Sequence, residues 1–265
     1  QDVWSRLCGG DGAPGWTLEA VGIEPRRVAE TGAAVVHALH GDPFPRMIWP
    51  TNNQKLAAAT LFTLFFGGND LAPATRVDGE PVQGFLQRHY LGALCQLARR
   101  LQGLPHVVGY DTMNEPSTGW IGCRDLTAHQ ERLRLGAMPT PFQAMLLGAG
   151  FAQEVEVWSL GLTGFKRKGT RRVNPTGARL WQEGRPCVWQ ENGVWDVDEA
   201  GQPRLLRPDH FSHRDGRPID FHADYLAPFA RRFAREIRAI DPHALLFLES
   251  PPQSGPFPWD PAQVP

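Results

Sequence analysis

Apolar residues recur at helical spacing over residues 84–102 and again over residues 223–240. Each stretch ends where Gly or Asp stands close to Pro, a combination that stops a helix. A short apolar run follows each break, at residues 107–110 and 244–248. The pattern predicts two helices, each of which leads through a tight turn into a strand.

Both predicted strands are apolar throughout, which is typical of parallel strands covered on both faces. Each run is followed by a glutamate near a proline, Glu115 before Pro116 and Glu249 two residues before Pro251. Parallel α/β folds gather their functional groups at the carboxyl ends of strands. We therefore expect Glu115 to lie where an open sheet or a barrel places its chemistry.

A third helix is predicted over residues 53–66, because this segment is apolar nearly all round. Thr51 or Asn52 is the expected N-cap. The glycine pair that follows is expected to end the helix and to leave Asn69 and Asp70 in a loop. This loop could face the same pocket as Glu115.

Residues 121–221 separate the first predicted strand from the second helix, and this connection is far longer than the roughly 2–6 residues of an ordinary barrel loop. We interpret it as an insertion above the strand ends, a lid or a substrate platform, with a hairpin around Ala200 and Gly201. Its aromatic residues could wall an apolar channel or could pack a small core of their own: Phe151, Trp158, Phe165 and Trp181.

Composition fits one large α/β domain: the chain has 265 residues, of which 42% are hydrophobic and 21% charged. The net charge of -1 does not favour nucleic acid as a partner. No apolar run is long enough to span a membrane. We interpret the four scattered cysteines as thiols rather than a disulfide framework. They are Cys8, Cys95, Cys123 and Cys187.

The chain begins with Gln1 and Asp2 and closes in a proline-rich segment. We treat it as a fragment, without its true N-terminus, and expect it to be marginally stable alone. Nothing resembles a signal peptide. The location in the cell stays open, with the cytoplasm favoured.

Glu115 is the candidate for chemistry, since a carboxylate at a strand end can act as acid, base or nucleophile. Asn114 could donate its amide to a ligand hydroxyl, and Pro116 stiffens the exit of the strand. The alternative is a glutamate that merely ends a strand.

The segment "GYDTMNEP" resembles the fourth-strand motif of retaining glycosidases of glycoside hydrolase family 5. Further segments resemble the branch that cleaves glucosylceramides and sterylglucosides and is related to endoglycoceramidases. They are "QDVWSR", "GGDGAPGWTLE", "TNNQKLAAATLFTLFFGGND", "QRHYLGALCQLARRL", "VVGYDTMNEPSTGWIG" and "NPTGARLWQEGRPCVWQENGVWD". Together they span most of residues 1–195 and are more specific than the Asn-Glu-Pro triplet alone.

The resemblance implies a (β/α)8 barrel, of which this chain would hold the end of strand three through strand five with a long insertion after strand four. It implies that Glu115 is the general acid/base and that Asn114 binds the sugar 2-hydroxyl. Gln1, Asp2 and Trp120 are further candidates for substrate binding.

The retaining mechanism needs a second carboxylate as nucleophile. The family carries it on the seventh strand, so we expect it beyond Pro265. Glu249 matches a fifth-strand glutamate that supports the site without attacking the sugar.

Two rival classes remain open. A metal-dependent hydrolase could use the His37-x-x-His40-x-Asp42 pattern or a histidine cluster, although neither has the context of a metal site. The cluster comprises His210, His213 and His222. A silent sugar-binding relative could stack sugars on tryptophans, namely Trp120, Trp181, Trp189 or Trp195.

The favoured interpretation is a retaining β-glycosidase that hydrolyses β-glucosides with an apolar aglycone, with an endo-β-glucanase of the same fold as the alternative. We predict no metal, no cofactor and no obligate protein partner. The basic run at 166–172 could make transient contact with anionic lipid headgroups, or could be a solvated loop.

Overall fold

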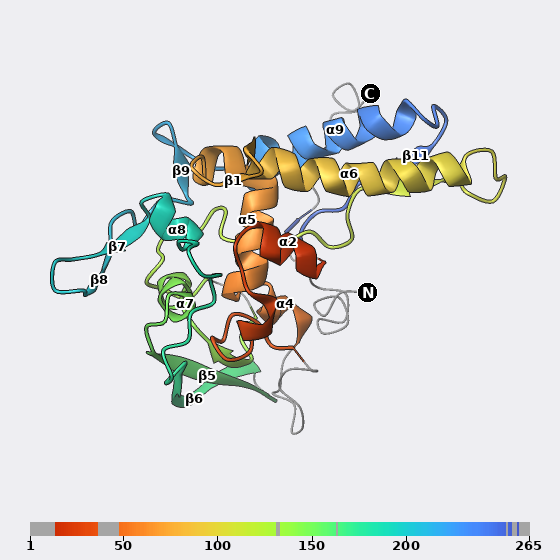
Figure 1. The fold of residues 1–265 in the computed structure, drawn as a ribbon. Helices are drawn as coiled ribbons and strands as arrows, with labels where there is room; N and C mark the ends of the chain where they lie inside the picture. Colours follow the sequence, from red (N-terminus) through yellow and green to blue (C-terminus); the bar gives the residue numbers. More distant parts are fainter. Residues whose placement is uncertain are drawn as a thin grey trace.

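The computed structural model describes residues 14–36, 48–130, 133–162, 164–252, 254–255 and 259. Its helices are α2 (Gly15–Ala20), η1 (Pro25–Arg27), α4 (Trp49–Asn52), α5 (Leu56–Leu71), α6 (Val82–Leu101), α7 (Pro141–Gly148), α8 (Val188–Glu191), the π-helical turn η2 (His222–Leu226) and α9 (Ala227–Arg238). Its strands are β1 (Arg76–Val77), β2 (Glu80–Pro81), β3 (Gly109–Asp111), β4 (Gly136–Met138), β5 (Gln153–Gly161), β6 (Gly164–Val173), β7 (Trp195–Val197), β8 (Pro203–Leu205), β9 (His213–Arg214), β10 (Arg217–Pro218) and β11 (Leu245–Phe247). The fold is therefore mixed α/β (Figure 1).

β3 and β11 lie parallel, in a register that places Asp111 opposite Phe247. The N–H of Thr112 extends the ladder by donating to the carbonyl of Phe247 at 2.9 Å. These are the two strands that the sequence predicted. The prediction that the runs at 107–110 and 244–248 form parallel strands is confirmed for residues 109–111 and 245–247, which pair in one sheet.

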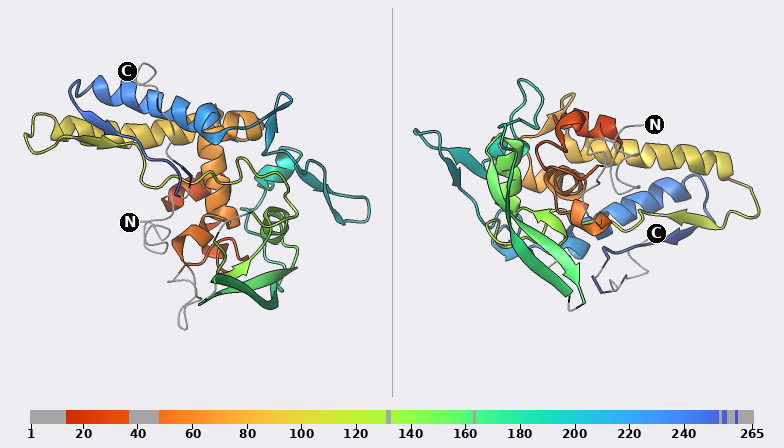
Figure 2. Two further views of the ribbon diagram at one scale, coloured as in Figure 1. Left: turned by 180° about the vertical axis from the view of Figure 1, so that it is seen from behind. Right: turned by 90° about the horizontal axis from the view of Figure 1, so that it is seen from below.

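Helices α6 and α9 lie side by side, and each leads into one strand of the parallel pair (Figures 1 and 2). α6 begins two residues before the predicted helix and ends one residue before its predicted end. The second predicted helix begins as the π-helical turn η2 and continues as α9. α9 buries Phe229, Phe233 and Ile237, the residues whose spacing predicted it.

α5 runs through the middle of the molecule and is buried on nearly all sides (Figure 1). The prediction that it ends at the glycine pair is wrong, because the helix continues to Leu71 with a kink at Gly67 (φ -122°, ψ 15°). A Cβ at Gly67 would lie 3.2 Å from side-chain carbons of Ile121 and Tyr225. The glycine allows this close packing, and Asp70 consequently lies in the last helical turn rather than in a loop.

The predicted N-cap of α5 is also wrong. Thr51 and Asn52 belong to the short helix α4, and Lys55 is the cap residue. The side chain of Asn52 accepts instead the N–H of Val35 at 2.8 Å, a contact between segments that a local cap signal cannot anticipate.

The segment 121–221 forms small antiparallel sheets. β4, β5 and β6 make one sheet in that order, and β7 pairs with β8 as the hairpin predicted around Ala200 and Gly201. α7 begins at a complete capping box, in which Thr140 and Gln143 satisfy each other's backbone N–H groups.

Four tryptophans are among the largest fully buried side chains: Trp120, Trp181, Trp189 and Trp195. Phe151 packs edge-on against Trp195, with ring centroids 6.3 Å apart. Phe151 and Trp181 thus belong to the core, which was the alternative to an apolar channel. The Nε1–H of Trp189 donates to Thr60 Oγ1 at 3.0 Å and ties this core to α5.

Cys95 and Cys187 are free and buried, as predicted, and Cys123 is buried, whereas Cys8 lies outside the described residues. None of the described helices has both the length and the apolar character needed to cross a bilayer.

The described strands form sheets of two or three members, and no closed barrel is present in this part of the chain. The strand pair β3–β11 exposes 58% of Leu245 and 48% of Phe247. The expectation that both faces of these strands are covered is therefore not met within the described residues.

Candidate active site

The carboxyl ends of β3 and β11 bring acidic residues together. Asp111 is the last residue of β3, and Glu249 follows the end of β11 by two residues. Glu249 Oε2 accepts the backbone N–H of Glu115 at 2.7 Å. The parallel pairing thus places Glu115 at a strand end, as predicted, with Glu249 beside its backbone.

Glu115 has an exposed side chain and a backbone φ of 42°. This left-handed conformation is uncommon for residues other than Gly, Asn and Asp. Pro116 and Ser117 are buried directly after it, so the chain turns back into the core. Strained backbone of this kind persists where the surroundings enforce it and often marks a functional site.

Neighbouring elements fix the loop that carries Glu115 at both ends. The hydroxyl of Tyr90 on α6 donates to the carbonyl of Thr112 at 2.8 Å. At the other end, the N–H of Trp120 donates to Thr63 Oγ1 on α5 at 2.9 Å. Gly119 has φ 58°, and a Cβ there would lie 2.5 Å from Thr63 Oγ1. Only glycine fits this close approach of loop to helix.

Asp111 is an acidic residue that the sequence reasoning missed. The pKa of Asp111 is raised above its ordinary value. Burial is the largest cause, and the neighbouring Glu249 carboxyl contributes the rest of the rise. Burial and the charge of Asp111 raise the pKa of Tyr90 to about 12, so Tyr90 stays neutral and donates. Asp111 comes close to Glu249 because β3 and β11 pair in this register, and local sequence does not reveal the register.

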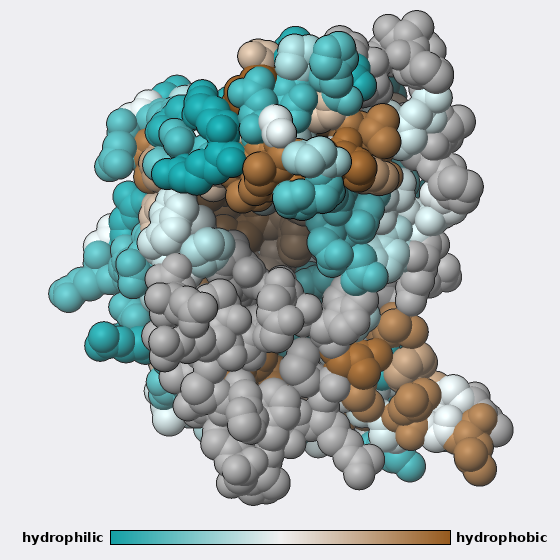
Figure 3. All heavy atoms as spheres, turned by 90° about the vertical axis from the view of Figure 1, so that its right-hand side faces the viewer, coloured by the Kyte–Doolittle hydropathy of each residue, from teal (hydrophilic) through white to brown (hydrophobic). Residues whose placement is uncertain are grey.

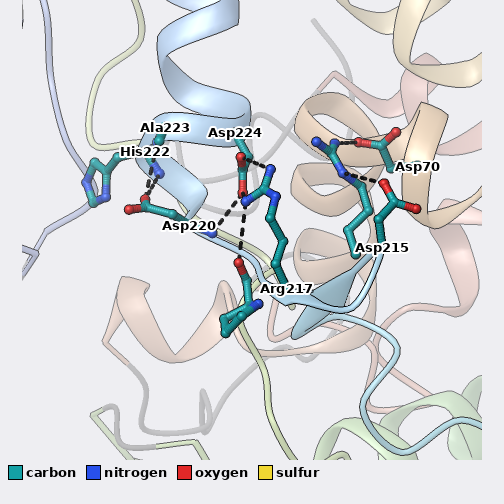
Figure 4. Close-up of polar contacts among 9 residues, drawn as sticks. Asp70, Asp215, Arg217, Asp220, His222, Ala223 and Asp224 are labelled. Atoms are coloured by element: carbon teal, nitrogen blue, oxygen red, sulfur yellow. Dashed lines mark hydrogen bonds and ion pairs between the residues drawn. The ribbon is translucent and has the colours of Figure 1, made fainter.

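Asn69 and Asp70 lie at the end of α5 and have partners away from Glu115. The N–H of Asn69 donates to Gln83 Oε1 at 2.9 Å, and the carboxylate of Asp70 pairs with Arg214. Figure 4 shows two separate polar networks near Asp70. In the first, Arg214 pairs with both Asp70 and Asp215, and in the second, Arg217 pairs with Asp224. Asn69 and Asp70 as sugar-binding residues stay a prediction.

Trp120 is 1% exposed and does not present an open face to a ligand. Its ring packs against Trp189 and Phe211, with centroids 5.4 Å and 5.7 Å away. Stacking on a sugar needs an accessible ring face, so this burial speaks against Trp120 as a platform. The same argument applies to the other three tryptophans proposed for stacking, since all are buried.

Gln1 and Asp2 lie outside the described residues, as do His37, His40 and Asp42. His210 Nε2 lies 2.7 Å from the carbonyl oxygen of Leu71, and burial lowers its pKa. Within the described ranges, no group of three His, Cys, Asp or Glu side chains could hold a metal ion.

Asn114 and Glu115 are both exposed at the end of β3. An exposed carboxyl beside an exposed amide can exchange a proton with a ligand and hold one of its hydroxyl groups. The geometry therefore fits acid–base chemistry on a hydroxylated substrate.

Comparison with known proteins finds relatives that are similar to this chain over most of its length. A glucosylceramidase of Rhizopus delemar is 41% identical over 251 residues, which cover 91% of this chain and 36% of that protein. An ergosteryl-beta-glucosidase of Saccharomyces cerevisiae is 33% identical over 299 residues, 97% of this chain and 39% of that protein. No family model matches the chain.

A crystal structure of Cryptococcus neoformans sterylglucosidase 1 with tris superposes with a TM-score of 0.90 at 35% identity. The match covers all of this chain and 42% of that one. The chain thus shares the fold of that part of a glycosidase, and it spans less than half the length of each relative named here.

Proposed function

We propose that this chain is the part of a retaining β-glucosidase that carries the acid/base, in glycoside hydrolase family 5. The complete protein, the gene product that contains these 265 residues, would hydrolyse glucosides with an apolar aglycone. The observation that carries the proposal is the exposed Glu115 at the end of a parallel strand, in a fold similar to that of a sterylglucosidase. β3 and β11 would be the fourth and fifth strands of a (β/α)8 barrel, with residues 121–221 as an insertion that forms a lid.

Glu115 would protonate the glycosidic oxygen as the bond breaks and would then activate water as a base. Asn114, next to it and also exposed, would hold the sugar 2-hydroxyl. The nucleophile has to lie about 5–5.5 Å from the acid/base carboxyl. Since Glu249 Oε2 accepts the N–H of Glu115, we place the nucleophile in the complete protein outside these residues.

The names of the relatives support a lipid aglycone, because they refer to glucosylceramide and to ergosteryl glucoside. An endo-β-glucanase is the alternative, and faster cleavage of soluble cellooligosaccharides than of glycolipids by the complete protein would favour it.

Replacement of Glu115 by Ala in the complete protein tests the proposal. Hydrolysis of natural glucosides should fall about 10³-fold in the first step, in line with general-acid contributions of about 10²–10⁴. Aryl glucosides with acidic phenol leaving groups should lose much less, because they depart without protonation. Their covalent intermediate should accumulate, and azide should speed turnover by entering the vacated space. Equal losses for good and poor leaving groups without azide rescue would assign Glu115 to binding or structure.

We also propose that the β5–β6 hairpin makes transient contact with an anionic lipid surface. Leu160 and Leu162 near its tip are 59% and 109% exposed. Figure 2 shows the hairpin along the edge of the molecule, and hydrophobic surface gathers on the arm at the lower right of Figure 3. The following strand adds five exposed basic side chains, Lys166, Arg167, Lys168, Arg171 and Arg172. An apolar tip next to cations is complementary to an anionic bilayer.

Vesicle sedimentation of the complete protein checks this contact. The double change Leu160→Ser with Leu162→Ser should weaken binding to vesicles that contain phosphatidylserine, and Lys166→Glu with Lys168→Glu should make the remaining binding insensitive to salt. Leu206→Ser, at a leucine that is 55% exposed on another hairpin, is the matched control. Equal binding of the wild type to neutral and anionic vesicles would contradict the proposal. So would a loss of stability in the double leucine variant, because it would mean that Leu160 and Leu162 are buried in the complete protein.

A further inference from the structure

The loop of residues 112–120, here the Glu115 loop, is attached to a different helix at each of its ends. At its first residue, the hydroxyl of Tyr90 on α6 donates to the backbone carbonyl at 2.8 Å. At its last residue, the backbone N–H donates to Thr63 Oγ1 on α5 at 2.9 Å. Because α5 and α6 pack against each other, both ends of the loop are held by neighbouring helices (Figure 1).

Thr63 does more than a threonine usually does inside a helix. Its hydroxyl donates to the carbonyl of Ala59 at 2.7 Å, which is the ordinary bond to the residue four positions earlier. The same oxygen also accepts the N–H of Trp120, and both residues are buried. Without the hydroxyl of Thr63, this backbone N–H would be buried without its acceptor, which is costly.

The loop backbone lies directly on α5 beside this bond. A Cβ at Gly119 would lie 2.5 Å from Thr63 Oγ1 and 2.6 Å from the carbonyl oxygen of Ala59. The N–H of Gly119 donates in turn to Oγ of Ser117 at 3.2 Å. Ser117 is buried and follows Glu115 by two residues. A series of contacts thus leads from α5 to the backbone next to Glu115.

We propose that Thr63 and Tyr90 are positioning residues that fix the carboxyl of Glu115 relative to the glycosidic bond. Their role in catalysis rests on the proposed acid/base function of Glu115. The left-handed backbone of Glu115, with φ 42°, is a conformation that persists only where the surroundings enforce it. Attachment of the loop at both ends supplies such enforcement. Misplacement of a catalytic group by about 1 Å can cost about 10²-fold in rate.

Thr60 offers a matched control on the same helix. It lies three residues before Thr63 and is equally buried. Its Oγ1 also accepts a tryptophan N–H, the indole Nε1–H of Trp189 at 3.0 Å. That bond ends on a side chain of α8 and does not hold the backbone of the Glu115 loop. Thr60→Val and Thr63→Val therefore each remove one buried acceptor, but only Thr63→Val releases the loop.

Kinetics of the complete protein test the positioning role. Thr63→Val and Tyr90→Phe should each slow the first step about tenfold to a hundredfold for glucosides with poor leaving groups, and much less for acidic phenols. Thr63→Ser keeps the hydroxyl and should restore most of the loss. Thr60→Val should leave the ratio of the rates for the two classes of leaving group unchanged. Equal losses for both classes in Thr63→Val and Tyr90→Phe, without rescue by Thr63→Ser, would overturn the proposal.

Hydrogen–deuterium exchange of the complete protein gives a readout that does not depend on activity. Peptides from residues 112–120 should exchange faster in Thr63→Val than in Thr60→Val, and Tyr90→Phe decides in both measurements if Thr63→Val does not fold. If exchange rises as expected but Glu115→Ala does not behave as an acid/base variant, the proposed function fails and the attachment of the loop stands. If exchange is unchanged while Glu115→Ala behaves as an acid/base variant, the positioning role is wrong and the proposed function stands.

Discussion

The insertion and the parallel strand pair bury their apolar side chains to very different degrees. In the insertion, Trp189 and Trp195 are 0% and 1% exposed. In and beside the strand pair, Val108 is 64% exposed and Leu245 is 58% exposed. The tryptophans of the insertion thus belong to a core that they share with α5, whereas the described part of the strand pair presents apolar surface.

The two regions also differ in how they hold polar groups. The indole N–H of Trp189 is satisfied by Thr60 on α5. At the strand ends, a buried oxygen of Asp111 has no described partner, and Glu115 adopts a strained φ. The insertion holds groups of the same kinds, since the indole N–H groups of Trp181 and Trp195 have no described partner and Asn174 has φ 54°. The strand ends differ in that their strained residue, Glu115, is also exposed and is the candidate for chemistry.

The largest expected effect on stability is in the insertion core. Trp189→Ala should lower the free energy of unfolding by about 3–5 kcal/mol, because it leaves a cavity between Trp120 and Phe211 and strips Thr60 of its partner. Urea unfolding of the complete protein measures this loss.

Trp16→Ala is the matched control, since Trp16 is 39% exposed and should cost far less. If both substitutions lower the free energy of unfolding equally, the buried Trp189 does not contribute to stability as its burial indicates. The comparison of the two regions would then fail.

Local patterns predicted the parts of the fold that depend on local forces. The spacing of Phe229, Phe233 and Ile237 defines a helix face by itself, and the apolar runs after α6 and α9 were assigned as parallel strands, which the register of β3 and β11 confirms. The hairpin of β7 and β8 likewise followed from a turn signal between two short strands.

Features set by distant contacts were missed or wrong. The helix α5 passes through Gly67 because Ile121 and Tyr225 pack against it, and neither is near it in sequence. The sequence makes Trp120 a candidate for stacking on a sugar, whereas its ring lies in the core, because composition does not tell which side chains turn inward. Asp111 went unnoticed because its partner is 138 positions away and is brought to it only by strand register.

The smallest expected effect lies at the strand end, where stability and function should separate. The φ of 42° at Glu115 suits glycine and penalises alanine, because a Cβ crowds the backbone in the left-handed region. In the complete protein, Glu115→Gly should therefore be more stable than Glu115→Ala by about 1 kcal/mol, while both lack the acid/base and hydrolyse natural glucosides equally poorly. Urea unfolding of the two variants side by side measures the difference. A more stable alanine variant would mean that the complete protein holds residue 115 with a negative φ, and the backbone strain at Glu115 would then be absent.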